Sequence, residues 1–122
     1  MKLACSTALI GATILCAGCS RSNLPKQNAT SAQAGAPDLM IQYGCPTCHV
    51  IPHVPGAVGK VGPSLDDLAQ RSYLAGTLQN SPENLVHWIQ HPQQIHPGTA
   101  MPEMGVTSAD ALRIAAFLQT NH

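Results

Sequence analysis

Apolar and polar positions divide the chain into three parts. Residues 3–17 are mostly apolar behind the basic Lys2, but they are fewer than the roughly 20 apolar residues that a membrane-spanning helix needs. Residues 20–36 are rich in Ser, Asn, Gln and Ala without apolar periodicity, which predicts a flexible polar tether. Short amphipathic patterns begin after this stretch, so we expect one folded domain over residues 37–122.

Two short helices are predicted in the first half of the domain. The first covers residues 38–44, because a proline precedes it, an acidic residue fits its first turn, and Ile41 offers an apolar contact. Residues 50–63 contain three prolines and three glycines, which predicts a long loop. The second helix covers residues 64–70, with Ser64 in the position of its N-cap. Its inward-facing residues are expected to be Leu65 and Leu68.

A third helix is predicted after Ser81, an N-cap serine that is followed by Pro82 in the first helical position and by an acidic residue. This helix is expected to stop before Pro92, because the residue ahead of a proline disfavours the helical conformation. Its apolar stripe has the spacing i, i+3, i+4 and consists of Leu85, Trp88 and Ile89.

Residues 93–106 are expected to form an extended loop, and a last helix follows it. Thr107-Ser108-Ala109-Asp110 is similar to a capping box with Asp in place of Glu. The buried face of this helix is predicted to contain Ala111, Ile114, Ala115 and Leu118. No segment of the sequence alternates as a strand does, so we expect an all-α fold with three to four short helices and long loops.

The first 19 residues have the pattern of a secretory signal peptide: a basic start, an apolar run and small residues at its end. Cys16-Ala17-Gly18-Cys19 resembles the lipobox of bacterial lipoproteins, except that the family usually has Leu at the first position. The resemblance implies lipid attachment at Cys19 and a protein anchored on the periplasmic side of a membrane. Ordinary cleavage nearby and an uncleaved anchor are the alternatives.

The charged residues are distributed unevenly, although the net charge of the chain is zero. The domain contains all six acidic residues but only three of the six basic ones, which are Lys60, Arg71 and Arg113, so its net charge is −3. This charge excludes the basic surface that nucleic-acid binding requires. It predicts that a protein partner would present a basic patch.

Chemistry is indicated by Cys45-Pro46-Thr47-Cys48-His49, a C-x-x-C-H sequence of the kind that attaches c-type haem. Two intervening residues allow both cysteine sulfurs to reach the vinyl groups at the haem edge. The residue after the second cysteine then lies beneath the ring, where His49 can ligate the iron. We therefore predict one covalently bound haem c per chain.

Two other chemistries use similar residues. Cys-Pro-x-Cys also occurs in glutaredoxin-type thiol sites, but these lie between a strand and a helix, and no strand is predicted before Cys45. A zinc site would need further ligands at suitable spacing. The histidines available for it are His53, His87, His91 and His96.

Met101 is the leading candidate for the sixth iron ligand, because Pro97 and Pro102 keep the chain around it extended. A neutral thioether opposite a histidine raises the reduction potential, since it favours ferrous iron. Met104, which we expect to be a packing residue, is the nearest rival. His91 and His96 are the other rivals, and we expect both to be solvated.

The domain resembles class I cytochrome c along nearly its whole length and in the order of the family's motifs. The residues that carry the resemblance are Tyr43-Gly44-Cys45-Pro46-Thr47-Cys48-His49, Val61-Gly62-Pro63-Ser64-Leu65, Pro82-Glu83-Asn84-Leu85, Trp88-Ile89, Pro92, Pro97-Gly98-Thr99-Ala100-Met101-Pro102, Gly105-Val106-Thr107, Asp110-Ala111 and Ile114-Ala115-Ala116-Phe117-Leu118.

This resemblance implies a small cytochrome c fold wrapped around one haem. It implies His49 and Met101 as axial ligands, and a hydrogen bond from the His49 ring to the Pro63 carbonyl. It also implies pocket or propionate contacts from Arg71, Tyr73 and Trp88. The sequence departs from the family at His53, where Gly is common.

These observations together predict an electron-transfer protein rather than an enzyme, because an iron with His and Met ligands has no open position. Its partners would be a periplasmic or membrane-bound electron donor and acceptor. Three alternatives stay open: a haem sensor from which Met101 dissociates, a thiol redox module without haem, and an electron-delivering subunit of a larger dehydrogenase or oxidase.

Overall fold

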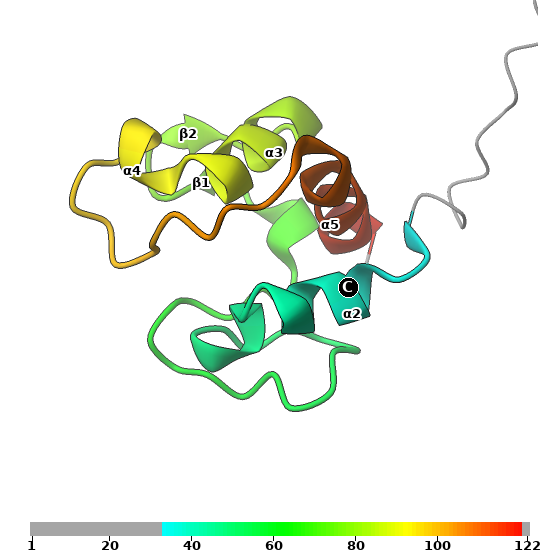
Figure 1. The fold of residues 1–122 in the computed structure, drawn as a ribbon. Helices are drawn as coiled ribbons and strands as arrows, with labels where there is room; N and C mark the ends of the chain where they lie inside the picture. The colour runs from blue at the N-terminus through cyan, green and yellow to red at the C-terminus, as the bar shows by residue number, and fades with distance from the viewer. Residues whose placement is uncertain (1–32, 121–122) are drawn as a thin grey trace, which may run out of the picture.

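The computed structural model describes residues 33–120, which form a small and mostly helical domain with one two-stranded sheet (Figure 1). The elements in chain order are α2 (Ala36–Gln42), the 3₁₀ turns η1 (Cys45–Thr47) and η2 (Leu68–Gln70), β1 (Tyr73–Leu74), β2 (Leu78–Gln79), α3 (Pro82–Gln90), α4 (Pro92–Ile95) and α5 (Ser108–Thr120). The predicted signal segment, with Cys19, lies outside the described residues. Among residues 33–120, no helix is long and apolar enough to span a membrane.

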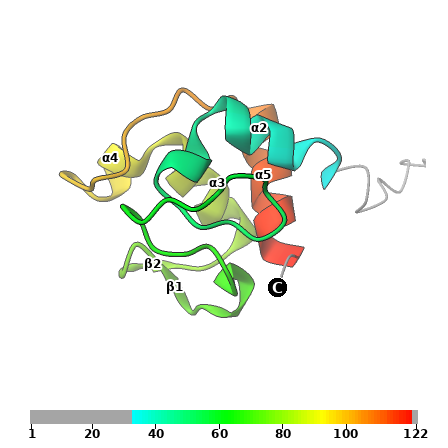
Figure 2. The same cartoon turned by 90° about the horizontal axis from the view of Figure 1, so that it is seen from below.

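The C-terminal helix α5 organises the domain, because α3 and α2 both pack against it (Figure 1). The long loop between η1 and η2 lies beside α2 and away from α3 at the bottom of Figure 1, so it faces the viewer in Figure 2. α4 follows α3 after a single residue, and the chain then returns to α5 through an extended loop.

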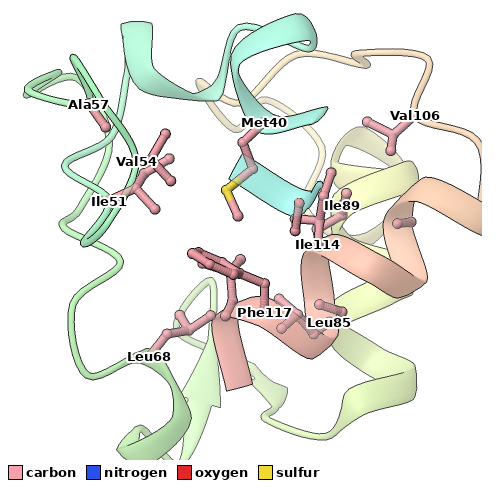
Figure 3. Close-up of a cluster of buried hydrophobic side chains, with 14 of the residues drawn as sticks. Met40, Ile51, Val54, Ala57, Leu68, Leu85, Ile89, Val106, Ile114 and Phe117 are labelled. Carbon is pink, nitrogen blue, oxygen red and sulfur yellow. The ribbon is translucent and has the colours of Figure 1, made fainter. Parts of the chain in front are cut away.

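The apolar core is assembled from all of these parts (Figure 3). Met40 of α2 and Phe117 of α5 point toward one another, and Leu68 reaches in from η2. Ile51 and Val54 contribute from the long loop. The loop is therefore fixed to the helices by buried side chains rather than by regular secondary structure.

Two helices form as their sequence signals predict. The Ser81 hydroxyl accepts a hydrogen bond from the Asn84 amide at 3.2 Å, which caps α3 as expected, and α3 ends before Pro92. The Thr107 hydroxyl accepts a hydrogen bond from the Asp110 amide at 3.2 Å, which caps α5. The predicted buried face of α5 is confirmed, because Ala111, Ile114, Ala115 and Leu118 are all buried.

The first helix forms, but its apolar contact was assigned to the wrong residue. Ile41 is 47% exposed, whereas its neighbour Met40 is completely buried. The helix begins at Ala36, two residues earlier than predicted, with Gly35 in the left-handed conformation before it (φ 79°). Ala36 is itself buried, so packing against the core extends the helix into the end of the predicted tether.

The helix predicted over residues 64–70 is wrong in extent. Only the 3₁₀ turn Leu68–Gln70 forms, because Asp67 adopts a left-handed conformation (φ 52°) that an α-helix cannot accommodate. The Ser64 hydroxyl accepts a hydrogen bond from the Asp66 amide at 3.2 Å and caps no helix. The inward orientation of the leucines is confirmed, since Leu68 is buried and Leu65 packs against the core.

Two elements were not predicted. β1 and β2 form an antiparallel hairpin, so the expectation of no strands is wrong; strands of two residues are too short to show alternation. Their turn places Ala75 and Gly76 at positive φ, and alanine carries no signal for that conformation. The second element is α4, a single turn that begins at Pro92 and continues through the first three residues of the segment expected to be extended loop.

Candidate cofactor site

A cavity of about 520 Å³ opens between the helices and the two long loops. Its lining is mostly apolar, and Met40, Leu85, Ile114 and Leu118 connect it with the core. All the residues predicted to hold or contact the haem line this one cavity: Cys45, Cys48, His49, Pro63, Arg71, Tyr73, Trp88 and Met101. Residues that lie 56 positions apart in the sequence thus share one site of the size that binds small molecules, roughly 300–1,000 Å³.

The turn η1 presents both cysteines to the cavity. Gly44, at φ 78°, turns the chain out of α2, and the amides of Cys48 and His49 both donate to the Cys45 carbonyl at 3.2 and 3.1 Å. Both cysteines are half-buried and free, so no disulfide joins them. Burial raises the pKa of the Cys45 thiol, an effect that a backbone hydrogen bond reduces in part.

His49 is oriented by the loop that faces it. Its Nδ1 lies 2.7 Å from the Pro63 carbonyl oxygen, so the hydrogen bond expected between these groups is present. The Gly62 amide donates to the Cys48 carbonyl at 2.8 Å, which brings this part of the loop against the C-x-x-C-H turn. Because Nδ1 donates to a carbonyl, the lone pair of a neutral imidazole is on Nε2.

Met101 reaches the cavity from the loop after α4 and is half-buried. Two of its rivals line the same cavity. Met104 also packs against the core, as expected for a packing residue, and His96 is exposed to solvent as expected. His91 instead lies beside Glu103, with 3.8 Å between its Nδ1 and the carboxylate.

The three predicted pocket residues differ in their surroundings. Trp88 faces the cavity half-buried, between Leu85 and Ile89 of the predicted α3 stripe, which are both buried. Tyr73 is 59% exposed at the cavity rim. Arg71 donates from Nη2 to the carbonyls of Ser64 and Asp66, at 2.6 and 2.9 Å, so its guanidinium is held in place by the long loop.

The alternative chemistries receive no support from these surroundings. Within residues 33–120, no three His, Cys, Asp or Glu side chains gather as a metal ion would require. Reactive redox cysteines have a lowered pKa, whereas the pKa of Cys45 is raised. The element that precedes Cys45 is the helix α2, not the strand of a thiol redox fold.

The donor groups at the cavity match those by which c-type haem is held: two thiols, an imidazole and a thioether. An apolar cavity and a carbonyl that orients the imidazole add to the fit. The contribution of Gly62 was not anticipated, because only the folded chain shows that it lies against the His49 ring. The sequence signal available for it was a glycine directly ahead of Pro63 in a loop rich in both residue types.

No protein-family model matches the chain. Over 81 residues it is 32% identical to cytochrome c oxidase subunit 2 of Alkalihalophilus pseudofirmus, an alignment that covers 65% of this chain and 22% of the relative. It is 28% identical over 81 residues to cytochrome c oxidase subunit 2 of Bacillus sp. strain PS3, covering 65% of this chain and 23% of that protein. The chain thus matches less than a quarter of the length of these curated relatives.

Proposed function

We propose that this protein is a monohaem c-type cytochrome that passes single electrons between redox proteins. The observation that carries the proposal is the convergence of Cys45, Cys48, His49 and Met101 on one apolar cavity. In this proposal both cysteines form thioether bonds to the haem, and His49 and Met101 ligate its iron. The bound haem supplies the one-electron chemistry.

The protein's own residues adjust the site for that task. His49 donates its Nδ1 proton to the Pro63 carbonyl at 2.7 Å, which fixes the ring and increases its basicity as a ligand. The Met101 thioether is a neutral donor that favours the ferrous state. The apolar lining and Trp88 limit the access of water, and Arg71 lies at the cavity wall where a propionate would find a cation.

The optical spectrum of the purified protein tests this proposal. We expect a c-type spectrum in both oxidation states and a weak near-infrared band from sulfur-ligated ferric iron. Met101→Ala should abolish that band, while Met104→Ala, the matched control from the same loop, should retain it. A c-type spectrum without the band would transfer the sixth position to a histidine or leave it open, as in a sensor. Protein without haem, from cells that mature c-type cytochromes, would contradict the proposal.

The similarity to two oxidase subunits supports a general role in electron transfer. It also favours a second candidate function, in which the domain delivers electrons as part of a larger oxidase. Purification from membranes under mild conditions separates the two. A stable complex with oxidase subunits would indicate a subunit, whereas a monomer that reduces the oxidase at a salt-dependent rate would indicate a free carrier.

Export and lipid anchoring are part of the same proposal, because a carrier between membrane proteins benefits from being held at the surface. We expect the protein at the periplasmic side, attached through Cys19. Cys19→Ser should move haem-containing protein from the membrane fraction to the soluble periplasmic fraction. Retention of this variant in the membrane would indicate an uncleaved anchor.

A further inference from the structure

One side chain of α4 makes three hydrogen bonds to the loop that contains Met101. Gln93 Nε2 donates to the carbonyl oxygens of Thr99 and Met101, at 2.7 and 2.8 Å. Its Oε1 accepts from the Gly98 amide at 3.2 Å. Two carbonyls and one amide are matched by the two donors and the acceptor of a carboxamide, so this orientation of the group satisfies every partner.

The loop has little else to determine its conformation. From position 97 to position 103 only Thr99 and Met101 are half-buried and the other residues are exposed, so burial of side chains contributes little to fixing the chain next to Met101. The local hydrogen bonds are short-range, from the Thr99 amide to the His96 carbonyl at 3.1 Å and from the Met101 amide to the Thr99 hydroxyl at 3.4 Å. Bonds of this kind shape a turn but do not fix its distance from the cavity.

Gln93 is itself held firmly. It follows Pro92, one of the largest fully buried side chains, at the start of α4. Its backbone amide donates to Glu103 Oε1 at 3.3 Å, which ties the far end of the loop to the same turn of helix. The loop is thus connected to α4 on both sides of Met101, and Gln93 takes part in both connections.

We propose that Gln93 is the residue that positions Met101 for iron ligation. This inference rests on the proposed function, because it concerns the sixth ligand of a bound haem. The carboxamide fixes the backbone of Met101 directly, so the thioether does not have to order the loop when it binds the iron. Without these bonds the loop would sample conformations in which the sulfur has left the cavity, and the ligand would be weaker.

The test compares three holoproteins: wild type, Gln93→Ala and Gln94→Ala. Gln94 is the matched control, because it is the same residue type on the same helix but is exposed and approaches only His91 Nδ1, at 3.4 Å. The readouts are the near-infrared band of the ferric protein and carbon monoxide binding to the ferrous protein. For Gln93→Ala we expect a weaker band and an about tenfold lower carbon monoxide concentration at half-saturation, equivalent to the loss of about one to two net hydrogen bonds.

Gln93→Glu provides a second, isosteric variant. Its carboxylate can still accept the hydrogen bond from the Gly98 amide. It has no proton to donate to the Thr99 and Met101 carbonyls, so oxygen lone pairs face each other there and repel. Protonation restores one donor. The near-infrared band of this variant should therefore strengthen as the pH falls, a response that a general loss of stability would not produce.

The outcomes separate this inference from the function on which it rests. If wild type has the band and Gln93→Ala retains it with unchanged carbon monoxide affinity, the positioning role is overturned while the cytochrome proposal stands. Equal effects of Gln93→Ala and Gln94→Ala would overturn it as well. A wild-type protein with haem but without the band would overturn the assignment of Met101, and the role of Gln93 with it.

Discussion

Gly62 lies directly against the imidazole of His49. A Cβ atom at position 62 would be 2.7 Å from Nδ1 and 2.9 Å from Nε2 of that ring, closer than carbon and nitrogen atoms pack. The φ angle of Gly62 is not in the left-handed region, so the requirement for glycine at this position comes from space alone. The ring is therefore confined between the Gly62 backbone on one side and the cavity on the other.

Gly62→Ala should displace the ring and weaken its hydrogen bond to the Pro63 carbonyl. We expect the holoprotein to lose about 1–3 kcal/mol of unfolding free energy, the usual cost of overpacking. The reduction potential should change as well, because the basicity of the ligand depends on that hydrogen bond. Denaturant unfolding and a redox titration measure the two effects. Lys60→Ala, an exposed neighbour in the same loop, is the control and should change neither.

The site could be predicted from the sequence where neighbouring residues alone determine the local geometry. The C-x-x-C-H turn brings Cys45 and His49 together through bonds between near neighbours, so its sequence is sufficient to identify it. Contacts that depend on distant packing gave no such signal. Gln93 has no property in the sequence that separates it from Gln94, and only the position of α4 decides which of the two faces the Met101 loop.

The fold was likewise predictable where local hydrogen bonds determine it, and not where distant packing does. The hydroxyls of Ser81 and Thr107 each accept a hydrogen bond from the amide three residues later, and both helices were predicted near their observed bounds. Asp67 interrupts a segment whose apolar spacing suggested a helix, because the long loop and not the local pattern determines its backbone. Met40 is buried in place of Ile41 because the orientation of α2 is set by α5.

Tyr43 joins α2 to α5 through a hydrogen bond from its hydroxyl to Asp110 Oδ2 at 2.8 Å. The pKa of the Asp110 carboxyl is lowered, chiefly by this hydrogen bond. The hydrogen bond from the Thr107 hydroxyl and the charge of Arg113 lower it further. A carboxyl whose pKa is lower in the folded state stabilises the fold above its unfolded pKa. That contribution is lost as the pH falls through the folded pKa.

Tyr43→Phe should therefore lower the urea midpoint at pH 7, and the difference from wild type should shrink by pH 3. Asp110→Asn and the double variant complete a mutant cycle at each pH. The coupling between the two positions should be favourable at pH 7 and weaker at pH 3, which is below the unfolded pKa of the carboxyl. A coupling that stays the same at both pH values would show that the ionised carboxylate is not the partner that matters.

His53 adopts a left-handed backbone conformation with φ 61°, which glycine adopts without steric cost. A side chain in this conformation costs about 1–2 kcal/mol, which exceeds the entropy that glycine adds to the unfolded chain. His53→Gly should therefore raise the unfolding free energy by about 0.5–1 kcal/mol. Lys60→Gly in the same loop, where φ is not positive, should lower it. Thermal unfolding of the holoproteins measures both changes, and a destabilised His53→Gly would point to a contact of the His53 ring.

Arg71 has two roles that a single substitution separates. Its Nη2 bonds to the Ser64 and Asp66 carbonyls hold the chain next to Pro63, whereas its charge is available to a propionate at the cavity wall. Arg71→Lys preserves the charge but loses the Nη2 group, held in the guanidinium plane, that donates to both carbonyls. We expect the reduction potential of this variant to stay close to that of wild type. Its unfolding free energy should fall by about 1.5–3 kcal/mol, the range for hydrogen bonds to a charged donor. Arg113→Lys on the exposed face of α5 is the control and should leave both quantities unchanged. A potential that shifts in Arg71→Lys as far as in Arg71→Ala would mean that the loop position, and not the charge, is what Arg71 supplies to the site.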